Sequence, residues 1–487
     1  MSATKEQKLA AAAEQQKKDR AFRRNTIIVV AVVIVLVIAA AFINSSYLST
    51  HTTAITIGDT KYSPAEFSYF YKTTLSQTYN TLTQQFGEMA SVVLNPNTPL
   101  KDQPYSDGQT WHDVIYDTTV RNMQQITVFY DAAQKAGMTL SEAGKLAVEQ
   151  SVAQTTVQAQ QNGLSLDAFL ASYIGKGMNE ALYRSLLEKY NLAMDYSAAM
   201  MDDVTYTEDE LAAYYAEHAD EYDYYDYYAY SISYTSDLVS GAADPKAAAK
   251  DAAAVIAGAA DGDAFVANVK AFAGESATSI MSHYVASGIS SEYKDWVTDP
   301  ARQPGDTTVV EGESSAYAVM FVGTDHNDYA AVDMRHILIL AEANENGEYT
   351  DAALAAAEEE ANAVYAQWKL DPTEENFANL ANIISEDAGS NNNGGLYSQI
   401  TKNSMVPEID SFLFDESNEV GATAVLYGSN GSYVGYHVVY LAGRGEKVCN
   451  LMAENAMKSA EYTTRYEAMS AAYSAVEGSG MKFASVG

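Results

Sequence analysis

The sequence predicts an α+β multidomain protein with an N-terminal transmembrane helix, a helical module, two tandem domains that mix strands with helices, and a C-terminal helix. Three observations indicate this organisation. An apolar run without charges lies near the N-terminus, residues 54–222 show mainly helical spacing, and residues 223–446 contain the same order of elements twice. At 487 residues the chain is also too long for one ordinary hydrophobic core.

The apolar run covers residues 27–43, and a helix of this length rises roughly 26 Å, close to the thickness of the hydrocarbon core of a bilayer. Lysines and arginines are frequent before it and absent after it until Lys61. This asymmetry predicts a cytoplasmic basic leader at 1–25, an anchor at 26–44 and an extracytoplasmic remainder, in a single-pass protein of the cell membrane. A cleaved signal peptide is the alternative, because Ala39–Ala41 are small.

Composition excludes several classes of protein. The net charge of −35 repels phosphate backbones, so nucleic-acid binding is not expected. A single cysteine, Cys449, excludes an intramolecular disulfide and a cysteine-based zinc cluster. The chain has no P-loop, HExxH or GxSxG motif, and its histidines lack the spacing of metal ligands. We therefore expect neither a cofactor nor a metal.

The helical module is predicted at 54–222. It begins with a short strand, a Gly-Asp turn and a helix start at Ser63-Pro64. Apolar residues then recur every three or four positions in four segments, residues 67–86, 111–138, 139–163 and 178–201. A Thr-x-x-Glu capping box opens a further helix at 206–222.

Residues 223–326 and 332–446 read as two copies of one unit. Each copy contains a strand, an alanine-rich helix, a second helix and two closing strands. The spacings also agree between the copies, from Phe265 to Ala273 as from Phe377 to Ser385, and from Trp296 to Gly305 as from Phe412 to Gly421. Each copy has the size of a small domain. The remaining residues, 447–487, contain an amphipathic helix that we expect to pack against the N-terminal helices.

The second copy carries a set of motifs in a characteristic order. DMRHILIL at 333–340 is followed by an F-x-x-L-A segment that leads to Ser-Glu-Asp, by a GG-L turn, and by the closing strand GYHVVYL at 435–441. Residues 332–446 thereby resemble the parvulin-type peptidyl-prolyl isomerases, which makes 223–326 a degenerate parvulin-like domain. The helices at 54–222, with the C-terminal helix, are similar to the chaperone part of the PrsA/SurA-type extracytoplasmic foldases.

The resemblance implies a set of site residues. The catalytic positions of the family fall on His336, His437 and Asp387, and its substrate-binding positions fall on Leu396, Met405, Ile409 and Phe414. The sequence departs from the family at Tyr397, where a glycine usually follows the leucine, and at Ile409, where an aromatic residue is common. The reaction requires no nucleophile or metal, because only rotation about the amide bond, with a barrier of about 18–20 kcal/mol, has to be eased.

The first copy provides an internal comparison. A lone histidine at a strand end is most often a packed core residue, but two histidines in the family's register favour a site. In the first copy the aligned positions hold Ser231, Tyr317 and Glu275 in place of His336, His437 and Asp387. We therefore expect the first copy to be catalytically silent.

The sequence thus predicts a membrane-anchored foldase. Its expected partners are unfolded or partly folded secreted polypeptides with X–Pro bonds and the lipid bilayer that holds its single N-terminal helix; homodimer formation stays open. Two other functions are compatible with the sequence. One is a holdase chaperone whose parvulin folds only bind, and the other is a cell-surface structural or adhesive protein.

Overall fold

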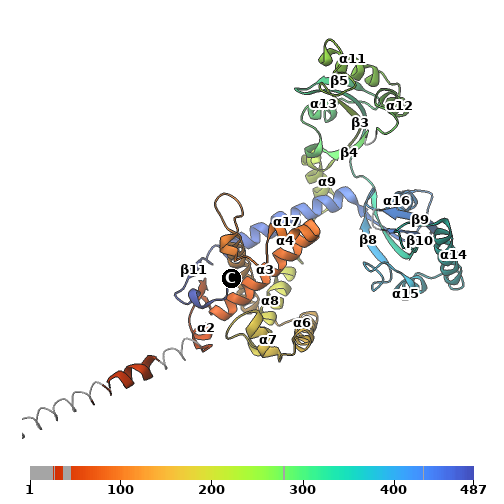
Figure 1. Cartoon of the computed structure of the whole chain (residues 1–487). Helices are drawn as coiled ribbons and strands as arrows, with labels where there is room; N and C mark the ends of the chain where they lie inside the picture. Colours follow the sequence, from red (N-terminus) through yellow and green to blue (C-terminus); the bar gives the residue numbers. More distant parts are fainter. Residues whose placement is uncertain are drawn as a thin grey trace, which may run out of the picture. The chain divides into compact units, whose positions relative to one another are not determined.

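The computed structural model describes residues 45–277, 280–430 and 433–486, together with Arg23, Thr26 and residues 28–36. The chain divides into two compact units, Met1–Thr205 with Ala460–Gly487, and Tyr206–Ser459. The first unit is mainly helical, and the second contains two antiparallel sheets with helices (Figure 1). The chain is therefore a multidomain protein of helices and sheets, as the sequence predicts.

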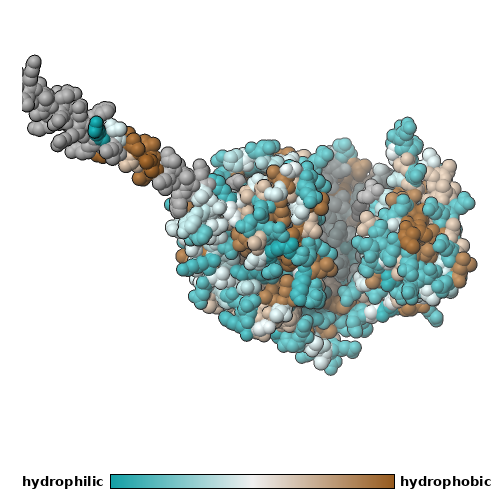
Figure 2. All heavy atoms as spheres, turned by 90° about the horizontal axis from the view of Figure 1, so that it is seen from below, coloured by the Kyte–Doolittle hydropathy of each residue, from teal (hydrophilic) through white to brown (hydrophobic). Residues whose placement is uncertain are grey.

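The predicted anchor at 26–44 lies largely outside the described residues. Its described part, residues 28–36, is helical, and the large apolar side chains there are exposed, as the brown atoms of that segment show in Figure 2. Among the described residues no helix is both long and apolar enough to cross a membrane.

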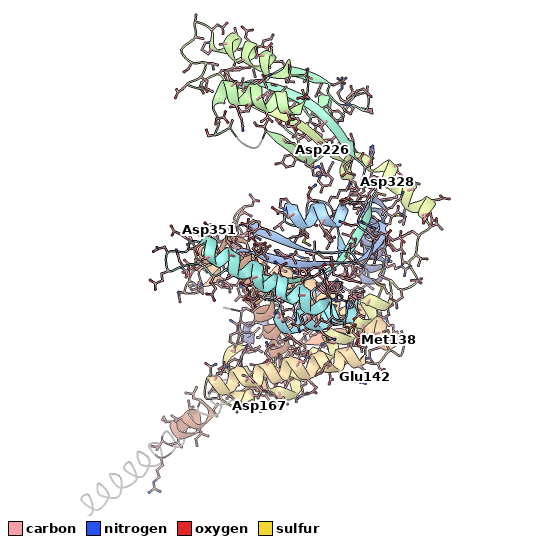
Figure 3. All side chains as sticks on the ribbon, turned by 90° about the vertical axis from the view of Figure 1, so that its right-hand side faces the viewer. Met138, Glu142, Asp167, Asp226, Asp328 and Asp351 are labelled. Atoms are coloured by element: carbon pink, nitrogen blue, oxygen red, sulfur yellow. The ribbon has the colours of Figure 1, made fainter. Side chains whose placement is uncertain are left out.

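Five longer helices form most of the first unit. They are α3 (Pro64–Phe86), α5 (Trp111–Lys135), α6 (Glu142–Gln161), α7 (Leu166–Tyr173) and α8 (Glu180–Ala199), with the short helices α2 (Tyr47–His51) and α4 (Ala90–Val93). Side-chain caps define where they begin. Ser63 accepts a hydrogen bond from the backbone N–H of Glu66 in a capping box, and Thr110 and Asp113 repeat this arrangement at the start of α5. Figure 3 marks Glu142 at the first residue of α6.

The C-terminal segment completes the first unit. The last part of helix α17 (Val448–Ser470) belongs to the first unit. Its Tyr462 and Tyr466 pack on Phe129 of α5, with centroids 6.0 and 5.6 Å from that of the Phe129 ring. Strand β11 (Ala475–Glu477) then pairs antiparallel with β1 (Ile55–Ile57), which also pairs with β2 (Thr60–Tyr62). Residues near the start and near the end of the sequence therefore share one small sheet and one core.

The boundary between the units lies at Thr205, and not at 222 as the sequence suggests. The helices α9 (Glu208–Glu217) and α10 (Ala219–Tyr222) belong to the second unit, because Leu211 and Tyr215 pack against Ala453 near the start of α17. Helical periodicity shows that a segment is amphipathic, but it does not identify the surface that its apolar face covers.

The first sheet of the second unit has the strand order β4-β3-β6-β5. Its strands are β3 (Tyr224–Ser233), β4 (Met281–Val285), β5 (Thr307–Glu311) and β6 (Ser315–Asp325), and its helices are α11 (Pro245–Ala257), α12 (Gly262–Ala273) and the short α13 (Lys294–Val297). The second sheet has the order β8-β7-β10-β9. Its strands are β7 (Ala330–Leu340), β8 (Leu396–Ile400), β9 (Thr423–Asn430) and β10 (Tyr433–Lys447). Since β7 takes the place of β3 and β10 that of β6, the two sheets share one topology.

Alternation along β7 and β10 divides the second sheet into two faces. On one face, Ile337 and Val438 form a core with α14 (Asp351–Trp368) and α15 (Glu374–Ile384); Asp351, at the first residue of α14, is labelled in Figure 3. On the other face, Met334 and Val439 pack with α16 (Pro407–Phe414). His336 and His437 lie on this second face, in phase with Met334 and Val439.

Candidate active site

The pairing of β7 with β10 brings His336 and His437 together. His336 lies opposite Val439, and His437 lies opposite Leu338, so the two histidines are offset by two residues on neighbouring antiparallel strands. Their Nδ1 atoms are 3.1 Å apart, and their rings are nearly parallel, with centroids 5.3 Å apart. Both side chains are buried, with residue exposures of 6% and 2%. Two side chains that are far apart in the sequence thus form one hydrogen-bonded pair.

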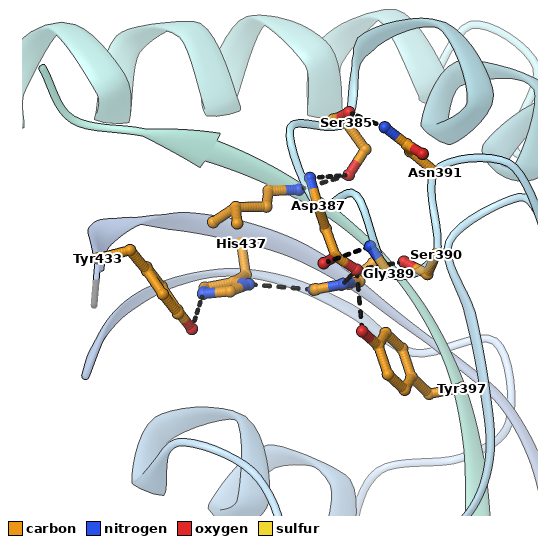
Figure 4. A network of polar contacts seen from close by, with 10 residues as sticks. Ser385, Asp387, Gly389, Ser390, Asn391, Tyr397, Tyr433 and His437 are labelled. Atoms are coloured by element: carbon orange, nitrogen blue, oxygen red, sulfur yellow. Dashed lines mark hydrogen bonds and ion pairs between the residues drawn. The ribbon is translucent and has the colours of Figure 1, made fainter. Parts of the chain in front are cut away.

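Asp387 extends this pair at the His336 end. Its Oδ2 lies 2.9 Å from Nε2 of His336 and also accepts hydrogen bonds from the hydroxyls of Ser390 and Tyr397, while Oδ1 accepts one from the backbone N–H of Gly389 (Figure 4). These donors, His336 first, hold the pKa of Asp387 well below its usual range. The carboxylate is therefore ionised at neutral pH.

The loop that carries Asp387 is fixed to β7. The Ser385 hydroxyl accepts hydrogen bonds from the backbone N–H groups of Leu338 and Asp387, at 3.1 and 3.3 Å, and Asn391 donates to the Ser385 carbonyl (Figure 4). Further along, His336 donates its backbone N–H to the carbonyl of Gly395, which has a φ of +70°. A Cβ at Gly395 would lie 2.2 Å from the carbonyl oxygen of His336, so only glycine fits this turn.

Tyr433 lies at the other end of the histidine pair. Its hydroxyl is 3.2 Å from Nε2 of His437 (Figure 4). Burial, followed by the effect of the neighbouring His336, lowers the pKa of His437 to about 4. The His437 imidazole is consequently neutral at physiological pH and has a hydrogen-bonding partner on each nitrogen.

The structure brings together only part of the predicted substrate-binding set. Met405 and Phe414 are half-buried at the edge of the apolar cluster beneath α16. Ile409 is 2% exposed and belongs to the interior of that cluster, so it is a core residue without a surface for a substrate. Leu396 pairs with Arg335, the neighbour of His336, which places it on the opposite face of the sheet. Neither Ile409 nor Leu396 thus lies beside the histidine pair in this structure, and their role in substrate binding stays a prediction.

Three residues beside His437 were not identified from the sequence. Leu426 pairs with His437 across β9 and β10 and shares its face. A Cβ at Gly428 would lie 2.6 Å from Nε2 of His437 and 3.2 Å from a methyl carbon of Val406. Because Gly428 has no side chain, the imidazole of His437 can occupy this space, and Val406 lies at its border. Alternation along β9 could have indicated Leu426, but nothing in the sequence marks Val406.

The surroundings of the pair combine low polarity with one fixed charge. Val406 and Leu426 lie beside the neutral imidazole of His437, whereas the Asp387 carboxylate lies on the other side of His336. Across the described parts of the chain, no group of three or more His, Cys, Asp or Glu side chains could hold a metal ion. The arrangement is suited to binding and orienting a neutral group, because an apolar surface strengthens each polar contact made beside it.

The first sheet lacks this arrangement. Ala229 donates its N–H to the carbonyl of Ile280 as His336 donates to Gly395, so Ala229 occupies the position of His336, and the prediction of Ser231 is wrong by two residues. Tyr317 corresponds to His437. Gly305 donates its N–H to the carbonyl of Phe321 as Gly421 donates to that of Leu441, and Tyr317 and His437 each lie four residues before that acceptor. Tyr317 packs on Tyr293, with ring centroids 5.5 Å apart.

Comparisons with known proteins agree with these motifs. The PPIC-type PPIase domain family matches residues 319–444. No curated protein matches the chain. Similar solved structures include a peptidylprolyl isomerase, PrsA, from Bacillus anthracis, with 18% identity, coverage of 29% of this chain and 54% of that chain, and a TM-score of 0.19.

Two further structures complete the comparison. The foldase protein PrsA from Streptococcus pneumoniae has 11% identity, with 76% of this chain and 91% of that chain covered and a TM-score of 0.25. A structure from a study of PEB4 and Cj1289, two SurA-like chaperones of Campylobacter jejuni, has 21% identity and a TM-score of 0.17. The match covers 29% of this chain and 51% of that chain. The match thus spans about half the length of the Bacillus anthracis and Campylobacter jejuni proteins. Residues 319–444 of this chain form a PPIC-type peptidyl-prolyl isomerase domain, the parvulin type.

Proposed function

We propose that this protein is an extracytoplasmic foldase that isomerises X–Pro bonds of unfolded or partly folded secreted polypeptides at its second sheet domain. The observation that carries the proposal is the buried pair of His336 and His437, hydrogen-bonded to each other and to Asp387 within the segment that matches the isomerase family. In this proposal His336, His437 and Asp387 are the catalytic residues.

The proposed catalysis lowers the barrier to amide rotation without covalent chemistry. A planar amide has more charge separation than a twisted one, so a site of low polarity disfavours the planar ground state relative to the transition state. Met405, Phe414 and Val406 would hold the proline ring beside the neutral imidazole of His437. Asp387 keeps His336 oriented through a hydrogen bond of 2.9 Å, so the polar groups are already in place when the peptide binds.

The helical unit supports the part of the proposal that concerns client binding. A hollow of about 360 Å³ lies between α3, α5 and α8, and its lining contains no charged side chain. Gln77, Asn122 and Gln125 offer amide groups there, beside aromatic and methionine side chains. An unfolded segment presents free backbone amides and apolar side chains, and this lining complements both. We propose that the hollow holds clients while the isomerase domain acts on their prolines.

Anchoring to the cell membrane is part of the same proposal. The basic leader at 1–25 and the apolar run at 27–43 favour a helix that holds the chain in the bilayer, with the N-terminus in the cytoplasm. The exposed apolar side chains of residues 28–36 support this assignment. Fractionation of cells after alkaline washing tests it: an anchored protein stays with the membranes, and release into the wash contradicts the anchor.

We propose further that the first sheet domain is a catalytically silent, parvulin-like copy. Ala229 offers no hydrogen-bonding group at the position of His336, and Tyr317 with Tyr293 occupies the region in which the second domain has its imidazoles. Such a domain can still contact extended clients through its aromatic side chains.

The decisive experiment compares full-length variants in an assay of cis/trans exchange on a short proline-containing peptide. We expect His336→Ala and His437→Ala each to lower kcat/KM by about tenfold or more, since each removes a fixed polar group at the reacting amide. His283→Ala is the matched control, because this histidine is half-buried and paired with Asp226 at 2.7 Å in the first sheet domain.

Two results would contradict the proposal. The unmodified protein could suppress client aggregation without catalysing cis/trans exchange. It would then be a holdase without isomerase activity. Equal loss in the His283 variant would show that the assay reports the general integrity of the protein and not the chemistry of the site.

A further inference from the structure

The hydrogen bonds of the site form one continuous chain of five side chains. Tyr433, His437, His336, Asp387 and Tyr397 are joined by contacts of 3.2, 3.1, 2.9 and 3.0 Å in that order. Tyr397 is one of the positions at which the sequence departs from the family that it resembles, and Tyr433 belongs to no sequence motif. The two tyrosines occupy the ends of the chain.

The direction of each hydrogen bond follows from Asp387. Its carboxylate can only accept, and it accepts from His336, Ser390, Tyr397 and the backbone of Gly389. Nε2 of His336 therefore carries a proton. With His336 neutral, its Nδ1 is an acceptor, and the donor in the contact of 3.1 Å between the two Nδ1 atoms is then His437; a second proton on His336 would reverse this contact and place the proton of His437 on Nε2.

The same reasoning continues to Tyr433. Because the proton of neutral His437 is on Nδ1, its Nε2 is an acceptor, and the Tyr433 hydroxyl at 3.2 Å is the donor. Burial raises the pKa of both Tyr433 and Tyr397, so both hydroxyls keep their protons throughout the physiological range.

We propose that Tyr433 and Tyr397 are positioning residues, which hold the two ends of a one-way hydrogen-bond chain and thereby fix the proton of His437 on Nδ1 and that of His336 on Nε2. Tyr433 covers the lone pair on Nε2 of His437, which otherwise permits the opposite tautomer and a turned ring. Tyr397 donates to the oxygen of Asp387 that holds His336, and the edge of its ring lies against that imidazole, with centroids 5.3 Å apart.

The inference deepens the proposed isomerase function, because the two tautomers decide the polarity that a bound proline amide meets. With His437 protonated on Nδ1, its N–H bond lies along the chain and does not reach the surroundings of Val406. In the opposite tautomer Nε2 carries the proton, and once Tyr433 no longer covers that nitrogen its N–H could donate to the bound amide. The tyrosines thus keep the low-polarity side of the site free of a donor.

The test uses the full-length protein labelled with ¹⁵N-histidine at pH 7, with signals assigned through His437→Asn and His336→Asn. Proton-coupled nitrogen shifts identify which nitrogen of each ring carries the proton. We expect Nδ1 for His437 and Nε2 for His336. In Tyr433→Phe we expect a mixture of the two tautomers at His437, and kcat/KM should fall about two- to tenfold, the effect of one hydrogen bond.

Tyr397→Phe keeps the ring and removes the other terminal donor. We expect a changed Nε2 signal of His336 with His437 still protonated on Nδ1, and a similar loss of kcat/KM. Tyr436→Phe is the control, because Tyr436 is adjacent to His437 on β10 but lies on the opposite face, with its hydroxyl 3.4 Å from Glu358.

A proton on Nε2 of His437 in the unmodified protein would overturn the inference. Unchanged histidine spectra in both Tyr433→Phe and Tyr397→Phe would overturn it as well. The nitrogen shifts do not depend on turnover, so the expected tautomers in a protein without isomerase activity would support the hydrogen-bond chain while refuting the proposed function.

Discussion

Folding strongly alters the protonation of His437. Its usual pKa near 6.5 falls to about 4 when β10 carries it into the sheet. Between these two values the unfolded chain binds more protons than the folded one, so acid favours unfolding of the domain. Asp387 acts in the same direction at lower pH, because its carboxylate must be protonated against the donors that hold it.

The first prediction at this scale concerns stability against pH. The free energy of unfolding of the second sheet domain should decrease by up to about 3 kcal/mol as the pH falls from 6.5 to 4, the window set by His437. Hydrogen exchange of the β10 amides, corrected for intrinsic rates, measures this local stability without assuming that the whole chain unfolds at once.

His437→Phe removes the titrating group and should flatten the pH dependence in that window, whereas His283→Phe should retain it. A slope that persists without His437 would assign the effect to other groups and refute the assignment.

At the scale of elements, the position of the histidines follows from the register of β7 with β10. A shift by one residue would move His437 to the opposite face and replace it with Tyr436 or Val438. The close approach of β9 adds a second constraint, since Gly428 leaves the room that the His437 ring requires. The site is thus built into the sheet, and α16 supplies only its apolar border.

Gly428→Ala tests this constraint. The added methyl group would lie 2.6 Å from Nε2 of His437, so we expect the ring to move, kcat/KM to fall about tenfold or more, and the domain to lose about 1–3 kcal/mol of stability through overpacking. Exchange kinetics with the proline peptide and hydrogen exchange of β9 measure the two effects.

Gly445→Ala is the control on β10, because a Cβ there would meet the Ala331 carbonyl at 3.7 Å, an ordinary contact. If Gly428→Ala retained full activity, the close packing around His437 would not matter for function.

At the scale of the whole molecule, the chain forms two compact units, and the proposed function assigns one task to each. The second unit contains the isomerase domain, and the first contains the uncharged hollow lined by Thr73, Gln77 and Asn122 among others. The proposed foldase therefore predicts that client holding and isomerisation can be changed independently.

Thr73→Trp should fill the hollow. We expect roughly tenfold weaker suppression of aggregation of an unfolded test protein, the effect of losing the burial of about one apolar side chain. The exchange rate of a short proline peptide should stay unchanged. Thr81→Trp, at an exposed position on the same helix, is the control. If both variants held clients equally well, the hollow would not be the client site.

Much of this organisation could be predicted from the sequence because it depends on local patterns. The capping box at Thr207 predicted a helix start that the structure contains. The apolar runs after the histidines in DMRHILIL and GYHVVYL predicted two buried strands with a histidine in each. These signals come from residues close together in the chain, where periodicity and caps act.

Sequence and structure differ where a turn or a packing partner decides the position of a side chain. Leu396 follows two glycines with positive φ, Gly394 and Gly395, and such a turn changes which face the next residues take. Ile409 has the composition of a pocket residue and of a core residue alike, and only the packing of α16 makes it core. Tyr433 lies on the face of His437 through strand alternation, but alternation alone does not bring its hydroxyl to Nε2 of His437.

The sequence by itself determined the strands, the helices, the repeated order of elements and the two histidines, because hydrophobic period and turn chemistry act over a few residues. Only the tertiary structure decided that the two imidazoles share a hydrogen bond, that Asp387 and two tyrosines complete it, and that the first sheet carries Ala229 instead. Contacts across a hundred residues depend on strand register and close packing, and neither leaves a local mark in the chain.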